Sequence, residues 1–347
     1  MICGAHFLRI VWGRKGRFAY FTILMVLGCF SVYNSLWDSS TCGCSSWSSL
    51  PVETQQELLK TLSTESRNKS LNDVAKDVWL PRPHSNQSTK FKHLITTTSC
   101  KNYYFLLILV SSTPNNLERR RNIRLTWGVD TFLPPRWKTA FVVAQPRDQH
   151  ESNVLLKETI TYEDILRVDF CDSYFSQTIK MQIGFEWASR YCKFSFLLRL
   201  DDDAVVNTME MLAVLKAPNT PQKKLYMGLL AAKAPAIRSG KYGVSKAEYS
   251  SQFYPPFCPG FGVVFSADVV ALFVDLFDLV PLFRLEDVYL GMVAQKAGIE
   301  ALNKDGFEAR PKPEIKCTGM TRKTLVRLGI TGECLFRLYK DTILNYT

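Results

Sequence analysis

Hydrophobic and polar positions divide the 347-residue chain into three stretches. Residues 18–33 are apolar and carry no charge, and the apolar character continues weakly to Trp37. Residues 38–99 are rich in Ser, Thr, Asn and Gln and offer no strand-like run, only one amphipathic helix over 53–62. From residue 103 onwards apolar runs alternate with amphipathic segments. We therefore expect the folded domain to occupy the last stretch, residues 100–347.

Strands and helices alternate along this last stretch. The run YYFLLILVS, at 103–111, has the continuous apolar character of a strand that is buried on both faces. Further strands are predicted near 139–144, 165–170, 194–200 and 224–229. Helices are predicted over 117–127, 152–161, 176–191, 267–280 and 287–297, with a loop rich in Gly and Pro around 254–262. This order predicts an α/β fold with a mixed, mostly parallel sheet flanked by helices.

The N-terminal apolar stretch is interpreted as a membrane anchor. Four basic residues precede it and Asp38 follows it. The positive-inside rule then makes 1–17 a cytosolic tail, 18–37 a type II signal-anchor and 38–99 a luminal stem. A cleaved signal peptide is the alternative, but no small-residue cleavage site follows the apolar stretch. Such a short span suits the thin membranes of the early secretory pathway, which predicts Golgi residence, with the ER as the alternative.

The composition narrows the class of protein. A hydrophobic content of 46% and a charged content of 22% exclude a mainly disordered, collagen-like or multi-span membrane chain. The net charge of +11 predicts an anionic partner or surface, such as phosphate, nucleic acid or lipid. A luminal domain without interleaved basic and aromatic repeats argues against nucleic acid.

The cysteines predict disulfides in the luminal part. Cys100 precedes the first buried strand and Cys192 precedes the strand at 194–200. Neighbouring positions for these strands in the sheet would bring the two residues within bonding range, about 4 to 7 Å, so we expect them to pair. Four cysteines then remain for two further bonds: Cys171, Cys258, Cys317 and Cys334.

The stem and the C-terminus carry candidate modification sites. Cys42 and Cys44 offer a covalent link between two copies of the chain, which would make a homodimer. N-glycosylation acceptor triplets begin at Asn68, Asn86 and Asn345, where a glycan would not disturb the folded core.

Three consecutive carboxylates, Asp201, Asp202 and Asp203, directly follow the predicted strand at 194–200. Ligands of open α/β sheets bind outside the carboxyl ends of the strands. Adjacent carboxylates repel one another unless a cation neutralises them, and hard oxygen ligands favour Mg²⁺ or Mn²⁺, which would hold a diphosphate. A solvated acidic turn is the alternative, but the buried strand before it favours the metal.

Two further segments carry candidate ligand-binding side chains. In ERRRNIRLTWG, helical spacing brings Arg120, Arg124 and Trp127 close to one face, where guanidiniums can bind phosphate and an indole can stack on a base. A solvated basic helix is the alternative. In RLEDVYLG, Glu286 and Asp287 lie at the start of a predicted helix, where Asp can cap the N-terminus; a carboxylate held there could instead act as a general base. The loop at 252–264 suits packing against a sugar ring, or a turn built around a disulfide at Cys258.

Four motifs in this order make the chain similar to a known family. RRNIRLTWG, LLRLDDDAVVN, YPPFCPGFGVVFS and LEDVYLGM resemble those of the β-1,3-galactosyltransferase and β-1,3-N-acetylglucosaminyltransferase family, inverting enzymes of the GT-A fold. The likeness spans about residues 100–299. It implies a GT-A-type domain on an anchor and stem, a UDP-sugar donor and Mn²⁺, with Mg²⁺ as the alternative ion.

The resemblance also implies roles for individual residues. The catalytic residues would be Asp287, as the base, and Glu286. The donor-binding residues would be Arg120, Arg124, Trp127, Arg199, Asp201 and Asp202. The metal ligands would be Asp203, Asp201 and Asn303. Family members usually place a metal-binding His near the position of Asn303, whereas all four His of this chain precede the acidic triplet. An amide oxygen binds Mn²⁺ more weakly than imidazole, which predicts a weaker metal requirement.

The predicted activity is transfer of galactose from UDP-galactose to GlcNAc, GalNAc or Gal in β-1,3 linkage, with inversion, on a protein or lipid glycan. The segment VSKAEYSSQFYPPFC resembles the galactosyl-transferring members most. Transfer of GlcNAc from UDP-GlcNAc is one alternative, and an inactive relative that binds glycans or a partner enzyme is another. A metal-dependent phosphohydrolase and a basic nucleic-acid binder rank below these.

Overall fold

The structure, a computed structural model, describes residues 94–344 except 97, 132, 133, 135, 174, 175, 310–316, 319 and 322. The predicted tail, anchor and nearly all of the stem lie outside the described residues, as do Cys42, Cys44 and the three glycosylation triplets. Over the described ranges, no helix has both the length and the apolar character that a membrane crossing requires.

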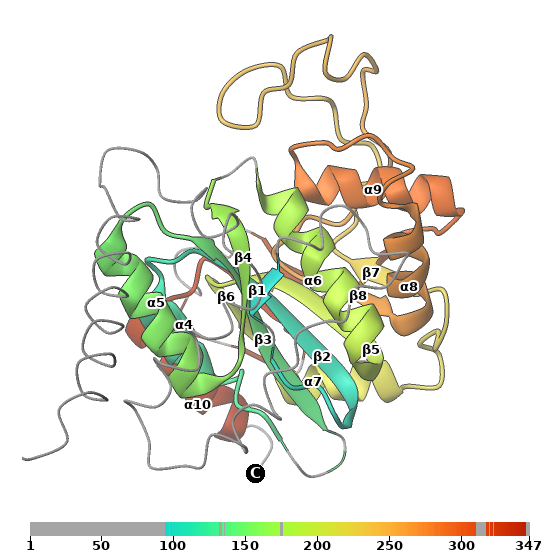
Figure 1. The fold of residues 1–347 in the computed structure, drawn as a ribbon. Helices are drawn as coiled ribbons and strands as arrows, with labels where there is room; N and C mark the ends of the chain where they lie inside the picture. The colour runs from blue at the N-terminus through green and yellow to red at the C-terminus, as the bar shows by residue number, and fades with distance from the viewer. Residues whose placement is uncertain are drawn as a thin grey trace, which may run out of the picture. The chain divides into compact units, whose positions relative to one another are not determined.

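A mixed sheet of eight strands forms the centre of the described domain (Figure 1). Its four middle strands are parallel, in the order β4-β3-β2-β5. They are β2 (Tyr103–Ser112), β3 (Trp137–Gln145), β4 (Ile165–Cys171) and β5 (Lys193–Asp201). One edge adds antiparallel β1 (Leu94–Thr96), and the other adds β8 (Val263–Ser266), β7 (Tyr226–Gly228) and β9 (Leu302–Asn303). The predicted mixed, mostly parallel sheet is confirmed.

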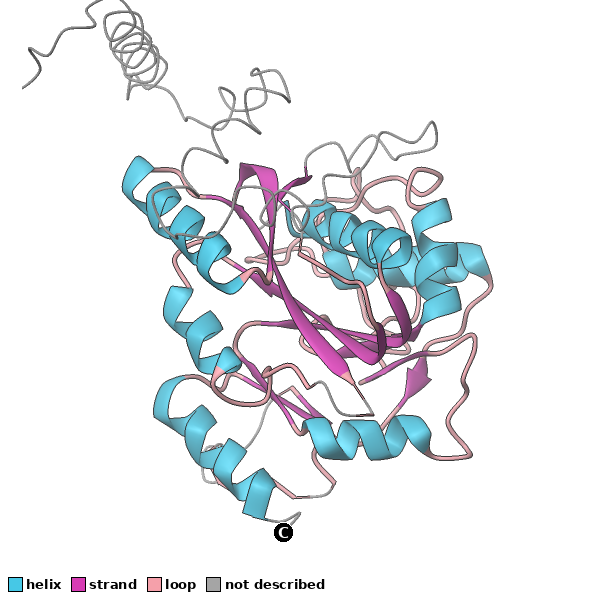
Figure 2. Ribbon diagram, turned by 60° about the horizontal axis from the view of Figure 1, so that its bottom comes forward, coloured by secondary structure: helices cyan, strands magenta, loops and turns pink. Residues whose placement is uncertain are grey.

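Helices cover both faces of this sheet (Figure 2), because strands such as β2 are apolar on both sides. Leu107 and Leu109 of β2 face one core cluster, while Leu106 and Ile108 face the other. The first cluster is covered by α6 (Gln177–Tyr191), α8 (Ala267–Leu276) and α9 (Glu286–Ala297). The second is covered by α4 (Leu117–Arg124), α5 (Gln149–Tyr162), α7 (Thr208–Lys216) and α10 (Gly332–Leu344).

A small second sheet lies next to the carboxyl end of β5. It has the order β10-β11-β6, from β10 (Phe307–Glu308), β11 (Val326–Leu328) and β6 (Ala204–Val206). The chain passes from β5 of the large sheet to β6 of the small sheet through the acidic triplet. The triplet is therefore a tight crossing between two sheets.

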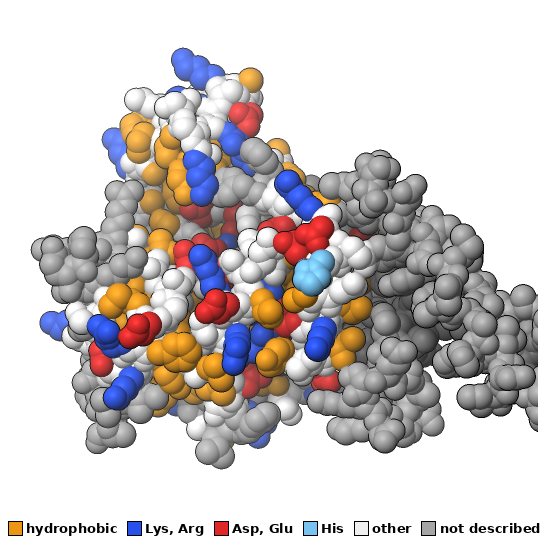
Figure 3. All heavy atoms as spheres, turned by 90° about the vertical axis from the view of Figure 1, so that its left-hand side faces the viewer, with side chains coloured by type: hydrophobic (Ala, Val, Ile, Leu, Met, Phe, Trp, Pro, Cys, Tyr) orange, Lys and Arg blue, Asp and Glu red, His pale blue; other side chains and the backbone are white. Residues whose placement is uncertain are grey.

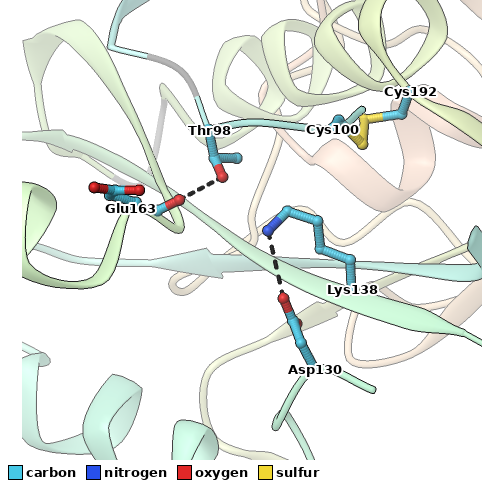
Figure 4. Close-up of a disulfide and its surroundings, with 6 residues drawn as sticks. All are labelled: Thr98, Cys100, Asp130, Lys138, Glu163 and Cys192. Atoms are coloured by element: carbon cyan, nitrogen blue, oxygen red, sulfur yellow. Dashed lines mark hydrogen bonds and ion pairs between the residues drawn. A yellow bond between two sulfur atoms is a disulfide. The ribbon is translucent and has the colours of Figure 1, made fainter. Parts of the chain in front are cut away.

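Disulfides tie the ends of the elements together. Cys100 and Cys192 pair, with a Cα–Cα distance of 5.1 Å, as the strand positions predict (Figure 4). Cys317 pairs with Cys334, and Cys171 is also disulfide-bonded. Cys258 is a free, buried thiol, so the prediction that it forms a bond is wrong. Its sulfur packs under Gly228, where a Cβ would come within 3.3 Å of it.

Two polar contacts near this disulfide fix the loops around β3 and β4 (Figure 4). Thr98 Oγ1 donates a 2.5 Å hydrogen bond to the carbonyl of Glu163, which ends α5 in the left-handed conformation. Lys138 Nζ lies 3.4 Å from Asp130 Oδ2. Near the start of the described domain, Thr98 is therefore attached to the end of α5 by a hydrogen bond, and Cys100 to the end of α6 by a disulfide.

Candidate active site

The acidic crossing between β5 and β6 is held by backbone hydrogen bonds. The carbonyl of Asp203 accepts from the Ile330 N–H at 2.7 Å, and the Asn207 N–H donates to the Leu325 carbonyl at 2.9 Å. Ser111 of β2 is the register partner of Asp201. The three carboxylates are thus placed at the carboxyl edge of the parallel strands, where ligands of such sheets bind.

Asp202 anchors the crossing to the end of β2. Asp202 is 6% exposed, and both of its carboxylate oxygens accept hydrogen bonds. Oδ2 accepts from Ser112 Oγ at 2.6 Å and from Asn116 Nδ2 at 2.8 Å, and Oδ1 accepts from Arg119 Nη1 at 2.9 Å. These three donors fix the Asp202 carboxylate against the end of β2 and the start of α4.

Asp201 and Asp203 are the more accessible carboxylates of the crossing. The Asp201 side chain is 44% exposed, with Oδ1 3.1 Å from Arg199 Nη1. Burial, and then the adjacent carboxylates, raise the pKa of Asp203. No group of three His, Cys, Asp or Glu suited to a metal occurs in the described part of the chain. Mg²⁺-type ions usually take one or two carboxylates, with substrate phosphates and water as further ligands, and this pair fits that pattern.

Arg199 joins the crossing to the start of α9. It is buried, and its guanidinium contacts Asp201, the carbonyl of Gly260 and the carboxylate of Glu286. Glu286 is 8% exposed, and its second oxygen, Oε1, accepts no hydrogen bond. Burial raises the pKa of Glu286 to about 8, although Arg199 opposes the rise. Glu286 thus holds the guanidinium between β5 and α9.

Asp287 is the partly exposed carboxylate of the same helix start. Leu285 is the N-cap of α9, and no side chain caps it, so the predicted capping role of Asp287 or Glu286 is wrong. Asp287 Oδ1 accepts from the Val288 N–H at 2.9 Å. Burial raises the pKa of Asp287, which outweighs that hydrogen bond. A carboxylate with a raised pKa is a stronger base in its ionised form.

The basic helix α4 is held inside the protein by carboxylates. Arg120 is fully buried, and Nε and Nη2 donate to the two oxygens of Glu158 at 2.9 and 2.6 Å. Arg124 donates to Glu158 and, through two nitrogens, to Asp164. Trp127 is 1% exposed within the core. Arg120 and Trp127 are therefore enclosed by the protein and Arg124 is mostly enclosed, while their contacts with a donor stay a prediction.

Arg120 acts on the crossing through Ser112. Its Nη1 donates to Ser112 Oγ at 2.9 Å and to the Thr113 carbonyl at 2.5 Å. The hydroxyl of Ser112 in turn donates to Asp202. A continuous chain of contacts thus runs from Glu158 through Arg120 and Ser112 to the acidic crossing.

The Glu158 carboxylate should make a large contribution to stability. We expect Glu158→Gln to lower the free energy of unfolding by about 3 to 5 kcal/mol, because it leaves the fully buried Arg120 guanidinium without a carboxylate and takes one of two carboxylate partners from Arg124. Chemical denaturation measures the change. The exposed pair of Glu333 and Arg337 is the control, since Glu333→Gln should cost about 1 kcal/mol or less. Equal costs for the two variants would contradict the proposed importance of the buried cluster.

Lys180 of α6 is a buried cation of this region that sequence patterns did not reveal. Its Nζ donates to the Ser112 carbonyl at 2.8 Å and to Asp172 Oδ1 at 3.0 Å. Burial lowers the pKa of Lys180, and Asp172 opposes the change. Helix α6 is buried around most of its circumference, so its hydrophobic spacing gave no signal that one position carries a charge.

Asn303 lies in the same row of the sheet as Arg199. Register pairs link Arg199 to Val263, Val263 to Gly228 and Gly228 to Asn303 across β5, β8, β7 and β9. The residue is exposed, and its Oδ1 accepts from the Leu230 N–H at 3.1 Å. Asn303 is thus at the level of the site but three strands from Arg199, about 14 Å at the usual strand spacing.

Comparisons with known proteins show which family of proteins the chain is similar to. A sequence model of the galactosyltransferase family matches residues 118–305. β-1,3-galactosyltransferase 1 of Homo sapiens is 34% identical over 266 residues, 75% of this chain and 79% of that protein. β-1,3-galactosyltransferase 5 of Pan paniscus is 34% identical over 199 residues, 56% of this chain and 66% of that protein.

Solved structures add little to these sequence matches. The crystal structure of the galactosyltransferase LgtC with donor and acceptor sugar analogues covers 70% of this chain and 96% of its own, at 10% identity. Its TM-score of 0.33 is too low to carry an argument. The sequence matches alone therefore show the family of the chain.

Proposed function

The chain belongs to the galactosyltransferase family, and we propose that it transfers galactose from UDP-galactose to a sugar hydroxyl in β-1,3 linkage with inversion. One observation carries the proposal: Arg199 contacts both the acidic crossing at the end of β5 and the start of α9. The crossing suits a diphosphate-bound cation, and α9 supplies a carboxylate that suits a general base. The acceptor is proposed to be a GlcNAc, GalNAc or Gal residue of a protein or lipid glycan.

The donor is proposed to bind at the crossing in a GT-A-type arrangement. Asp201 and Asp203 would hold Mn²⁺, or Mg²⁺, and the ion would neutralise the diphosphate as it leaves. Asp202 keeps the crossing in place through its contacts with Ser112, Asn116 and Arg119. Arg120 and Arg124 support the donor site from within, through Glu158, instead of binding the nucleotide themselves.

The transfer itself is proposed to be a single displacement. Asp287 would remove the proton from the acceptor hydroxyl as its oxygen attacks the anomeric carbon, while the bond from that carbon to UDP breaks on the opposite face. Glu286 is assigned a positioning role, since it is buried against Arg199. The partly exposed Asp287, with a pKa raised by burial, is the better placed of the two for proton transfer.

The cellular setting belongs to the same proposal. A type II anchor at 18–37 would place the domain in the lumen of the Golgi, where the predicted stem glycans and a homodimer through Cys42 or Cys44 would form. Oxidised cysteines in the described domain support a luminal, oxidising compartment.

Incubation of the full-length, detergent-solubilised chain with individual UDP-sugars, Mn²⁺ and an array of glycan acceptors tests the proposal. The expected result is transfer from UDP-galactose, with a β-1,3 product defined by linkage analysis. Transfer only from UDP-GlcNAc would replace the donor in this proposal. Binding of glycans without transfer from any UDP-sugar would favour the inactive relative.

A further inference from the structure

The segment between β7 and β8 forms a lobe that projects beside α9 (Figure 1). We define the acceptor lobe as residues 231–256. Its two ends are joined by an isolated bridge between Ala231 and Phe257, and the chain then reaches Gly260, whose carbonyl accepts from Arg199. At Gly291 of α9, a Cβ would come within 2.8 Å of the Pro256 carbonyl. The two ends of the acceptor lobe thus adjoin the candidate active site.

The acceptor lobe has a defined conformation although it lacks regular secondary structure. Arg238 donates from Nη1 to the carbonyls of Val244, Ser245 and Tyr249, and from Nη2 to that of Ser251, at 2.7 to 3.3 Å. A second bridge joins Pro235 to Phe253. The ring of Tyr249 packs on Tyr254 and on Phe283, which lies three residues before Glu286. The lobe is therefore fixed to the start of α9.

Two exposed aromatic rings of the lobe each have an ammonium group above them. Lys233 Nζ lies 5.0 Å from the ring centre of Phe253, and Lys241 Nζ lies 5.2 Å from that of Tyr242. The residues Phe253 and Tyr242 are 37% and 46% exposed. An aromatic ring offers a surface for the C–H face of a sugar, and an adjacent ammonium offers a partner for a negative charge.

The acceptor lobe carries an excess of positive side chains, whereas the candidate active site next to it is rich in carboxylates. Residues 231–256 contain Lys233, Arg238, Lys241 and Lys246 but a single acid, Glu248. That acid lies 3.2 Å from Arg284, outside the lobe. Figure 3 shows Lys and Arg side chains around the projecting part at the top of the view, above a surface where acidic side chains gather. The carboxylates of the candidate active site would repel a negatively charged acceptor, whereas the positive side chains of the acceptor lobe would attract it.

We infer that the acceptor lobe binds acceptor glycans that carry an anionic group, a carboxylate or a sulfate, on a sugar near the one that is galactosylated. The inference rests on the proposed function and names its substrate class. The accepting sugar would lie near Asp287, and the charged sugar would pair with the ammonium groups of Lys233 and Lys241 beside the exposed rings. Exposed ion pairs are weak and salt-sensitive, so each pair should change kcat/KM by up to about 5-fold.

A matched pair of acceptors tests this inference. Two oligosaccharides that differ only in a sulfate on the sugar next to the accepting one are compared with the full-length chain and UDP-galactose. The expected result at low salt is a kcat/KM about 5-fold or more higher for the sulfated acceptor, and a ratio that falls towards one at 0.5 M salt. Equal values for the two acceptors at low salt would overturn the inference.

Reversal of the lysine charges in the acceptor lobe tests whether the lobe causes the preference for the sulfated acceptor. In the Lys233→Glu/Lys241→Glu variant we expect the ratio of kcat/KM for the sulfated acceptor to kcat/KM for the neutral acceptor to fall below one. Lys223→Glu changes an exposed lysine outside the lobe and should keep the wild-type ratio. Melting temperatures show that each variant is folded. A preference that survives the lobe variant, or is lost equally in the control, would overturn the inference.

Binding separates this inference from the proposed function. If neither acceptor is galactosylated, the proposed function fails, and saturation-transfer NMR with the same two oligosaccharides still tests the lobe. Stronger binding of the sulfated one by the wild type, lost in the lobe variant, would support the binding assignment. Equal binding of both oligosaccharides by the wild type would overturn it.

Discussion

Replacement of Asp287 by Asn is expected to reduce galactosyl transfer by about 100-fold or more, the usual contribution of a general base. The side chain keeps its size, and its amide oxygen can still accept from the Val288 N–H, so α9 should begin as before. Only the basic oxygen is lost. UDP affinity, measured by calorimetry, should stay near the wild-type value because Asp287 is proposed to act on the acceptor.

Glu286→Gln is the matched control for this experiment. It replaces the carboxyl group by an amide of the same size and leaves an oxygen that can accept from the Arg199 guanidinium, so its effect on transfer should be smaller. Near-normal transfer by Asp287→Asn together with an inactive Glu286→Gln would assign the base to Glu286. Normal transfer by both variants would remove the pair from the mechanism.

The pH dependence of transfer provides an independent readout of the same residue. The pKa of Asp287 is raised by burial, whereas the helix N-terminus alone predicts a lowered pKa. The ionised, basic form is therefore lost at a higher pH than for an ordinary aspartate. We expect the acid limb of kcat/KM to lie at a higher pH than an ordinary aspartate would give, and to be absent from the residual activity of Asp287→Asn.

Hydrophobic periodicity predicted the long strands of the fold and missed short ones such as β8. Strands β2 and β5 are ten and nine residues long, and continuous apolar runs made both visible. Strand β8 has four residues and directly follows the predicted Gly- and Pro-rich loop. Its apolar run is too short to be recognised as a strand next to that loop. The predicted helix at 117–127 ends at Arg124, where the chain turns and places Trp127 in the core.

The candidate site was predictable where a motif lies next to a buried strand. The position of the acidic triplet follows from β5, and so does the pairing of Cys100 with Cys192. The partners of Arg120 were not predictable, because Glu158 belongs to another helix, 38 residues later in the chain. A basic segment looks the same in sequence whether it faces solvent, a phosphate or buried carboxylates.

Replacement of Asp203 by Ala is expected to abolish transfer at any Mn²⁺ concentration. The turn should survive, because its contact with Ile330 uses the backbone carbonyl of Asp203 and not the side chain. The loss therefore reports on the carboxylate, which with Asp201 is proposed to hold the cation and, through it, the diphosphate. Circular dichroism and thermal unfolding check the fold, and transfer is measured across a Mn²⁺ titration.

Asn303→His tests the proposed cation site by adding a stronger metal ligand instead of removing one. Imidazole binds Mn²⁺ more tightly than an amide oxygen, so this variant should reach half-maximal transfer at a lower Mn²⁺ concentration than the wild type. It also removes the amide that accepts from the Leu230 N–H, and Asn303→Ala controls for that loss. Asn303 is exposed and lies three strands from Arg199, so an Asn303→His variant with the wild-type Mn²⁺ dependence would remove this position from the proposed cation site. Full activity of the Asp203→Ala variant, or of the wild type in excess chelator, would exclude a required cation at the crossing.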